Sequence, residues 1–341
     1  RLSAPALLVA PASSPLPRDP GARFDAYVRV LPGDKWRAQA AVLRMVDGPH
    51  AIAAAPAWSR AATRWREGLQ RAAHSSNADA SGLLPALAIG DTSAADDRLT
   101  SDMRTSGLAH LSAVSGANVS IVLAAAIAIA YLLGFRRRAL GLVLVSVLLW
   151  FVVLARPSPS VVRAAAMALV MLSPLLAGMR RSPRGGDSLS LLAIATCLLL
   201  ILDPQLALSY GFALSVAATA ALVTAAGPLT RWLDVHLPGK REDAIVISPT
   251  PAQRLRAVPH RIRTWLIAAV AVTVCAQIAV TPLLLTMGAT VSWVSLPANV
   301  LAELAVPIAT MSGLAAAAAS QAAPPVAYAI ARPGVWATGW I

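Results

Sequence analysis

Polar side chains occur beside and within apolar stretches that are long enough to cross a membrane. Residues 107–119 carry four of them: His110, Ser112, Ser115 and Asn118. An apolar run from Ile121 to Leu133 follows directly. Because hydrogen-bonding groups are costly to bury in hydrocarbon, such residues usually face protein or a water-filled path. This segment is therefore a candidate lining for whatever crosses the membrane.

Four further polar residues lie in apolar segments: Arg163, Gln277, Asn299 and Glu303. The guanidinium of Arg163 could meet the phosphates of an entering polyanion, or it could extend to lipid headgroups, and the sequence leaves both roles open. Asn299 and Glu303 are four residues apart and share one helical face. A single buried acid more often belongs to a structural pair, so Glu303 is not expected to contact phosphate.

Several acidic residues and a histidine precede the first apolar segment: Asp91, Asp96, Asp97, Asp102 and His110. Paired acids can hold a metal or activate water. Their spacing matches no metal-ligand signature, and Ser112 and Ser115 do not sit in a Gly-x-Ser-x-Gly turn. Helix capping is the commoner role for Asp91 and for residues 100–102. We expect no metal, no cofactor and no catalysis, and we keep an outward-facing hydrolase as an alternative.

The composition is typical of a polytopic membrane protein. Of the 341 residues, 57% are hydrophobic and only 13% are charged, with a mean hydropathy of +0.64. Soluble proteins are about a quarter charged. The formal net charge of +13 suggests nucleic-acid binding, but basic residues also gather in the cytoplasmic loops of membrane proteins. Aromatic residues make up only 5%, so a channel rich in base stacking is not expected.

Seven apolar segments approach the length of about 20 residues that a spanning helix needs, and an eighth is a stub. They cover residues 112–134, 139–155, 159–178, 187–202, 206–227, 265–287, 292–318 and 322–331. The predicted fold is mainly α, a polytopic transmembrane helical bundle of about seven or eight spans. Pro297 and Pro307 predict a broken helix or a re-entrant hairpin. Residues 82–90 are too short to span and are predicted to dip into the membrane interface.

The charges of the loops predict the orientation of these spans. Basic loops at 135–138, 180–186 and 228–264 alternate with nearly neutral ones. The positive-inside rule places the basic set in the cytoplasm. Everything before residue 110 then lies outside the cytoplasm, and much of the net charge is explained without any nucleic acid.

The N-terminal part has a different character. Alternating polar and apolar residues predict strands at 22–30 and 38–46, and residues 56–74 form an amphipathic helix that could lie among lipid headgroups or pack on a neighbouring domain. We predict three domains: residues 1–50 as a small β-domain, 51–81 as an amphipathic linker and 82–341 as the transmembrane part. The chain begins at Arg1, without an initiator Met, so it is expected to be a fragment.

Five motifs, in order, resemble the competence domain of the ComEC/Rec2 family of DNA-uptake proteins over residues 82 to 318. They are Gly82–Asp91, Arg104–Val119, Pro159–Met167, Asp203-Pro204 with Gly211–Ser215, and Pro282 with Asn299. No single motif is specific, but five of them over a matching pattern of spans are. Three positions depart from the family pattern. Asn118, which cannot titrate, stands where the family has a histidine, Ala117 replaces the preceding leucine, and Ser209-Tyr210 replace an acid before Gly211.

The resemblance implies a bacterial inner-membrane protein that passes single-stranded DNA into the cytoplasm during natural transformation. It also implies an N-terminal domain of OB type, of which residues 1–50 would be a part, and a C-terminal metallo-β-lactamase-like nuclease that this chain lacks. The expected partners are single-stranded DNA, membrane lipid, a DNA receptor and a cytoplasmic motor. The sequence does not decide whether the pore forms within one chain or between the two chains of a homodimer. The candidate residues of the DNA path are Asp91, Arg104, His110, Ser112, Ser115, Asn118, Arg163 and Asn299. The motif positions expected to be structural are Gly107, Gly116, Gly211 and Pro282.

A secondary transporter of a small anion is the main alternative from another class. It would use Arg163 and the interrupted segment near Pro297 as its site. Transporters of this kind usually show paired internal repeats, and the sequence shows none.

Overall fold

The computed structural model describes residues 6–9, 23–25, 28–32, 41–45, 50–75, 77–112, 116–135, 137–156, 158–176, 186–237, 258–287 and 294–341. Two compact units make up the chain, Arg1–Glu67 and Gly68–Ile341. Their boundary falls inside helix α1 (Ala57–Ala73). Ser115 lies outside the described residues, so its predicted role stays a prediction.

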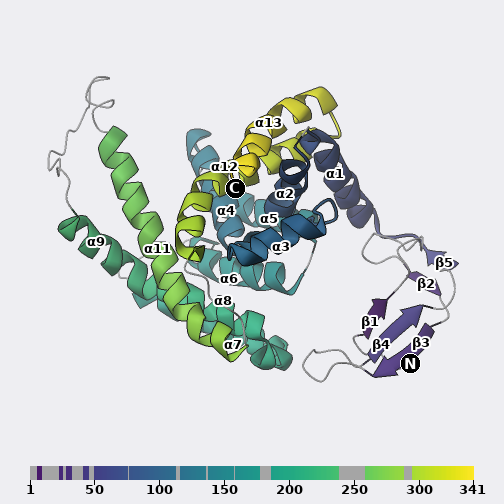
Figure 1. Cartoon of the computed structure of the whole chain (residues 1–341), viewed down its shortest axis with the longest axis horizontal. Helices are drawn as coiled ribbons and strands as arrows, with labels where there is room; N and C mark the ends of the chain where they lie inside the picture. Colours follow the sequence, from purple (N-terminus) through teal and green to yellow (C-terminus); the bar gives the residue numbers. More distant parts are fainter. Residues whose placement is uncertain are drawn as a thin grey trace. The chain divides into compact units, whose positions relative to one another are not determined.

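The first unit holds five short strands (Figure 1). Strands β1 (Ala6–Val9), β4 (Ala41–Met45) and β3 (Val28–Pro32) form a sheet in that order, with β1 parallel and β3 antiparallel to β4. Strands β2 (Arg23–Asp25) and β5 (His50–Ala53) form an antiparallel pair. Strands β2 and β4 fall in the stretches 22–30 and 38–46 where the sequence predicts strands, and β3 overlaps the first of them; the small β-domain of OB type stays a prediction.

The second unit consists of helices and the loops between them, with no strand among its described residues. Its helices are α2 (Ala78–Ile89), α3 (Asp97–Thr105), α4 (Gly116–Leu132), α5 (Arg137–Ala155), α6 (Pro159–Leu176), α7 (Gly186–Leu202), α8 (Tyr210–Ala221), α9 (Gly227–His236), α11 (Val258–Thr286), α12 (Ser295–Ala319) and α13 (Pro324–Trp340). Short turns of other helix types occur at η1 (Ala109–Leu111), η2 (Pro204–Leu208) and η3 (Leu222–Ala226). The chain is therefore mainly α, as the sequence predicts.

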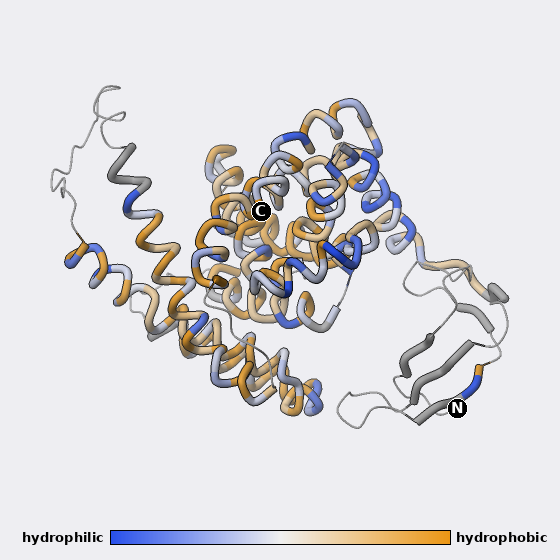
Figure 2. Tube along the Cα trace, in the orientation of Figure 1, coloured by the Kyte–Doolittle hydropathy of each residue, from blue (hydrophilic) through white to orange (hydrophobic). Residues whose placement is uncertain are grey.

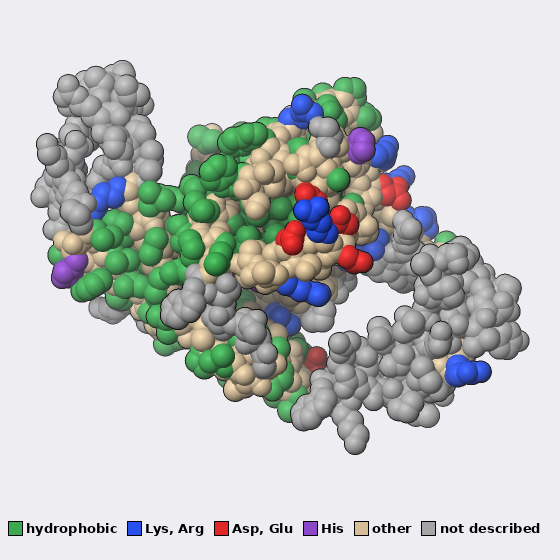
Figure 3. Space-filling view, in the orientation of Figure 1, with side chains coloured by type: hydrophobic (Ala, Val, Ile, Leu, Met, Phe, Trp, Pro, Cys, Tyr) green, Lys and Arg blue, Asp and Glu red, His purple; other side chains and the backbone are tan. Residues whose placement is uncertain are grey.

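Three of these helical stretches are long and apolar enough to cross a membrane: Tyr210–His236, Arg263–Thr286 and Ser295–Ala319. Five shorter apolar helices accompany them, and Figure 2 shows the hydrophobic residues along both sets. Hydrophobic side chains cover the visible face of α9 and α11, whereas charged ones gather around α3 (Figure 3). The helical unit thus exposes apolar surface that water would disfavour.

Helix α2 is enclosed by neighbouring helices, and the predicted dip of residues 82–90 into the membrane interface stays a prediction. Every residue from Gly82 to Ile89 is buried, and α12 and α13 both pack against this helix. Small residues allow the close approach: a Cβ placed on Gly313 would lie 2.5 Å from the Cβ of Ala88. At the other end, the hydroxyl of Thr338 donates to the carbonyl of Ala80 at 3.1 Å.

Helix α12 is continuous, so the predicted break or hairpin near its prolines is wrong. Pro297 is the third residue of the helix, where the backbone N–H has no helical partner to lose. Pro307 lies in the middle and is tolerated inside an otherwise unbroken helix. The predicted stub at 322–331 belongs to α13, which is longer and packs on α12 and α2.

The fifth predicted span, 206–227, also differs from the structure. The helix begins at Tyr210 and continues to His236 through a π-helical turn at η3. Pro228 follows that turn and cannot donate a backbone hydrogen bond, which accounts for the local change in helix type. Near the end of α9, Asp234 pairs with Arg263 of α11, so this arginine of the predicted basic loop is a structural link.

We expect Gly313→Ala to destabilise the protein, because its new Cβ would overlap Ala88 in the α2–α12 contact. Such overpacking lowers the free energy of unfolding by about 1–3 kcal/mol. Thermal unfolding of the detergent-purified protein measures this loss of stability. The matched control is Gly116→Ala on α4, where a Cβ meets nothing within 4 Å. Equal losses in the two variants would contradict the packing of α2 described above.

Candidate functional site

Asp91 organises the turn that follows α2. Its side chain is only 6% exposed. One carboxylate oxygen accepts from the hydroxyl of Ser93 at 2.7 Å, and the other accepts from the amide of Gln70 at 3.0 Å. Gln70 also donates to Ser93 at 2.8 Å. The carboxylate is therefore enclosed by donors and fixes the loop between α2 and α3.

The other acidic residues do not join Asp91. Asp96 caps α3 by accepting from the backbone N–H of Leu99 at 2.6 Å, so helix capping falls to Asp96. Asp102 faces Arg98 across 3.9 Å on the exposed side of the same helix. No group of three His, Cys, Asp or Glu side chains that could hold a metal occurs among the described residues. Arg104 is exposed at the end of α3.

His110 and Ser112 lie on the connection before α4, outside that helix. The Nδ1 of His110 donates to the carbonyl of Gly107 at 3.2 Å, and Ser112 donates to Ala109 at 2.8 Å. Surrounding protein lowers the pKa of His110 below its ordinary value, more than this hydrogen bond raises it. The lowered pKa favours the neutral ring over a positive charge that could meet a phosphate. Gly107 has φ +77°, and a Cβ there would lie 2.5 Å from that of Ser295 on α12.

Asn118 completes the buried end of α2. Gly90 turns the chain with φ +67°, and the N–H of Asp91 then donates to Pro85 rather than to Leu87. The carbonyl of Leu87 is left without its usual helical donor, and the amide of Asn118 supplies one at 2.9 Å. Asn118 is only 3% exposed. It therefore joins α4 to α2 through a buried hydrogen bond, and it does not face an open path.

Arg163 brings together two of the sequence motifs. It is the fifth residue of α6, and its Nη2 donates at 3.2 Å to the carbonyl of Gly211 in the first turn of α8. Only 8% of the side chain is exposed, and its Nε is buried without a hydrogen-bond partner among the described residues. Ser209 caps α8 by accepting from the N–H of Phe212. The guanidinium is thus turned inward, toward a helix start, and does not extend to the surface.

Asn299 and Glu303 share a face of α12, as predicted, but they have separate partners. Asn299 donates to the carbonyl of Ser295 within its own helix at 2.7 Å. Glu303 accepts from the hydroxyl of Thr273 on α11 at 2.9 Å. Both contacts are structural. Pro282, a predicted motif position, lies within α11, and no described contact brings it to the other candidates.

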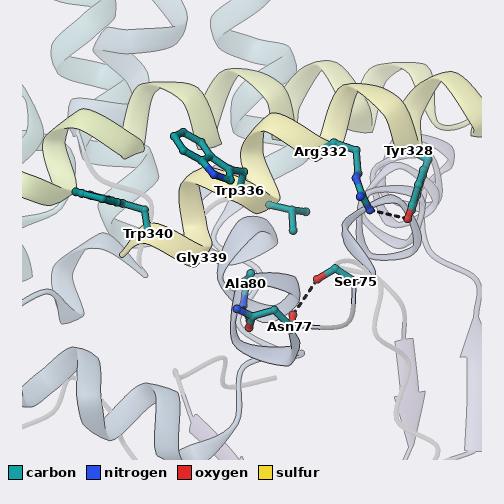
Figure 4. Close-up of a pocket in the computed structure, with 9 residues that line it drawn as sticks. Ser75, Asn77, Ala80, Tyr328, Arg332, Trp336, Gly339 and Trp340 are labelled. Carbon is teal, nitrogen blue, oxygen red and sulfur yellow. Dashed lines mark hydrogen bonds between the residues drawn. The ribbon is translucent and has the colours of Figure 1, made fainter.

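An aromatic cleft was missed by the sequence reasoning. It has a volume of 640 Å³ and lies between α13 and the start of α2, with Tyr328, Arg332, Trp336 and Trp340 on one wall and Ser75 and Asn77 on the other (Figure 4). Arg332 donates to the Tyr328 hydroxyl at 2.9 Å and stacks over its ring. The tryptophans are 72% and 58% exposed. The four-residue spacing from 328 to 340 could have revealed this surface.

Comparison with known proteins identifies one family and one relative. The family model described as "Competence protein" matches residues 87–341. The ComE operon protein 3 of Bacillus subtilis (strain 168) is 31% identical over 145 residues, which is 42% of this chain. The chain covers 18% of that relative's length. No solved structure matches the chain.

We expect Asn118→Ala to lower the free energy of unfolding by about 1–3 kcal/mol, because the Leu87 carbonyl is left buried without a donor. Asn118→His should lose less, since an imidazole N–H can donate. Chemical unfolding of the purified protein measures both. Ser120→Ala is the control on the same helix, where the exposed hydroxyl bonds only to Gly116. An Asn118→Ala protein as stable as this control would show that the bond contributes nothing.

Proposed function

The chain belongs to the competence protein family, of the ComEC/Rec2 type that its motifs predict, and on that premise we propose that it passes single-stranded DNA across the bacterial inner membrane. The family and the relative support a role in DNA uptake. One observation carries the step to a membrane path: the family match, over residues 87–341, includes the apolar helices from α4 to α13. The lining of such a path must solvate one negative charge per nucleotide and still release it.

We further propose that the chain acts without catalysis of its own and depends on a DNA receptor outside and a motor inside. The donors around Asp91 and the separation of the other acidic residues support this. The alternative, a small-anion transporter, relied on an interrupted helix near Pro297, and α12 is continuous there. DNA therefore fits the chain better than a small anion.

Deletion of the gene should abolish DNA uptake while leaving DNA binding at the cell surface intact. Labelled double-stranded DNA is offered to competent cells, and label that survives external nuclease is counted. The deletion strain should fall to the level of a non-competent strain, and the full-length gene should restore it. Nuclease-protected label at the parental level in the deletion strain would refute the proposed function.

The proposed orientation has a geometric consequence for α12. Gly68 and Gly107 contact its two ends: a Cβ on Gly68 would lie 2.1 Å from the Oγ of Ser320, and one on Gly107 would lie 2.5 Å from Ser295. The 25 residues of α12 extend about 37 Å, more than the hydrocarbon thickness of about 30 Å. If the chain before residue 110 is extracytoplasmic, both ends of α12 are on the outer side. We therefore propose that α12 lies obliquely and does not cross the bilayer.

Cysteine labelling tests this orientation. In a background with Cys197→Ser and Cys275→Ala, the exposed positions of His74→Cys and Thr105→Cys should both react with a membrane-impermeant maleimide on intact spheroplasts. Arg231→Cys on α9, proposed to be cytoplasmic, should react only after lysis. Labelling of just one of His74→Cys and Thr105→Cys would show that residues 68–107 cross the membrane together with α12.

A further inference from the structure

Arg163 is a buried cation without a counter-ion among the described residues. Its only described partner is the neutral carbonyl of Gly211, which accepts from Nη2. The Nε is fully enclosed and has no acceptor among the described residues. A buried charge is strongly disfavoured unless an opposite charge and hydrogen bonds compensate it. The structure therefore leaves a positive charge that an anion would stabilise.

The surroundings of the guanidinium increase the positive potential. Nη2 reaches the first turn of α8, a helix of 12 residues capped by Ser209. The N-terminal end of a helix carries a partial positive charge and free N–H groups, so it repels a cation and attracts an anion. The guanidinium lies beside this helix start, and a guanidinium and the N–H groups of a helix start are both groups that bind phosphate.

An anion can approach this pair at Gly211. The residue is exposed and has no side chain. A Cβ placed on it would lie 3.5 Å from Nη2 of Arg163 and 3.8 Å from Oγ of Ser209, so a larger side chain at this position would cover both polar atoms. The neighbouring Tyr210 is also exposed. The glycine thus leaves Nη2 uncovered by a side chain at this position, although the arginine as a whole is buried.

We propose that Arg163, with the first turn of α8 around Ser209 and Gly211, forms a binding site for one phosphodiester group of the transported single strand. This inference rests on the proposed function and names the chemical group that the path binds. A single site of this kind binds each phosphate weakly, as passage requires, because the strand must move on by one nucleotide after another.

The test measures binding of a single-stranded oligonucleotide to the full-length protein in detergent over a series of salt concentrations. Loss of one phosphate contact reduces the slope of log K against log salt by about 0.7. Arg163→Gln should show this smaller slope and bind about tenfold more weakly. Arg98→Gln, which removes an exposed arginine from α3, is the matched control and should keep the parental slope. Equal effects of the two variants would overturn the site in favour of diffuse surface charge.

A second variant separates the site from a structural role of Arg163. Gly211→Leu keeps the arginine and covers its guanidinium, so it should reduce the slope by the same amount at a parental melting temperature. If Arg163→Gln unfolds at lower temperature while Gly211→Leu binds DNA with the parental slope, the arginine is an interhelical clamp and the site is wrong.

The same variants distinguish this site from the proposed function as a whole. In cells, both should take up less labelled DNA than the parental strain. If the deletion strain loses uptake while both variants retain it, the proposed DNA transport is supported and the phosphate site at Arg163 is wrong. If the deletion strain takes up DNA normally, the function itself is wrong.

Discussion

The amide of Asn118 donates to the carbonyl oxygen of Leu87 and thereby closes the buried end of α2. This helix is enclosed over most of its length, so each backbone group at its ends needs a partner inside the protein. Asn118 provides one at the end, and Thr338 adds a hydrogen bond to the carbonyl of Ala80 near the start. Because these donors come from α13 and α4, burial of α2 fixes the positions of helices that are far apart in the sequence.

Two kinds of buried polar residue can be distinguished in the helical unit. Asp91 and Asn118 have donors or acceptors within hydrogen-bond distance, and they hold loops and helices in place. Arg163 has one neutral acceptor and an enclosed Nε without any, among the described residues. The first kind stabilises the fold, whereas the second is the place where a ligand would add stability. Of the buried and described residues that the sequence nominated for a DNA path, Arg163 is the one with a side-chain donor that lacks an acceptor.

Helix content and the approximate limits of α4 to α7 could be predicted, because long apolar runs bounded by charged residues leave few alternatives. The role of α2 could not, since an apolar run of that length looks the same whether lipid or protein surrounds it. The break near Pro297 was wrongly predicted because a proline in the first turn and one in the interior give the same sequence signal. The inward direction of Arg163 depends on Gly211, 48 residues away. An overall aromatic content of 5% also concealed the regular spacing of Tyr328, Trp336 and Trp340.

Transport by the reconstituted full-length protein tests the central claim most directly. Liposomes that contain the protein and an internal single-strand-binding protein as a trap are offered labelled single-stranded oligonucleotide, and the nuclease-protected label is counted. The account predicts protected label well above that of protein-free liposomes, and none for a double-stranded oligonucleotide of equal length. Entry of sulfate or phosphate without entry of the oligonucleotide would contradict it and would identify a small-anion transporter.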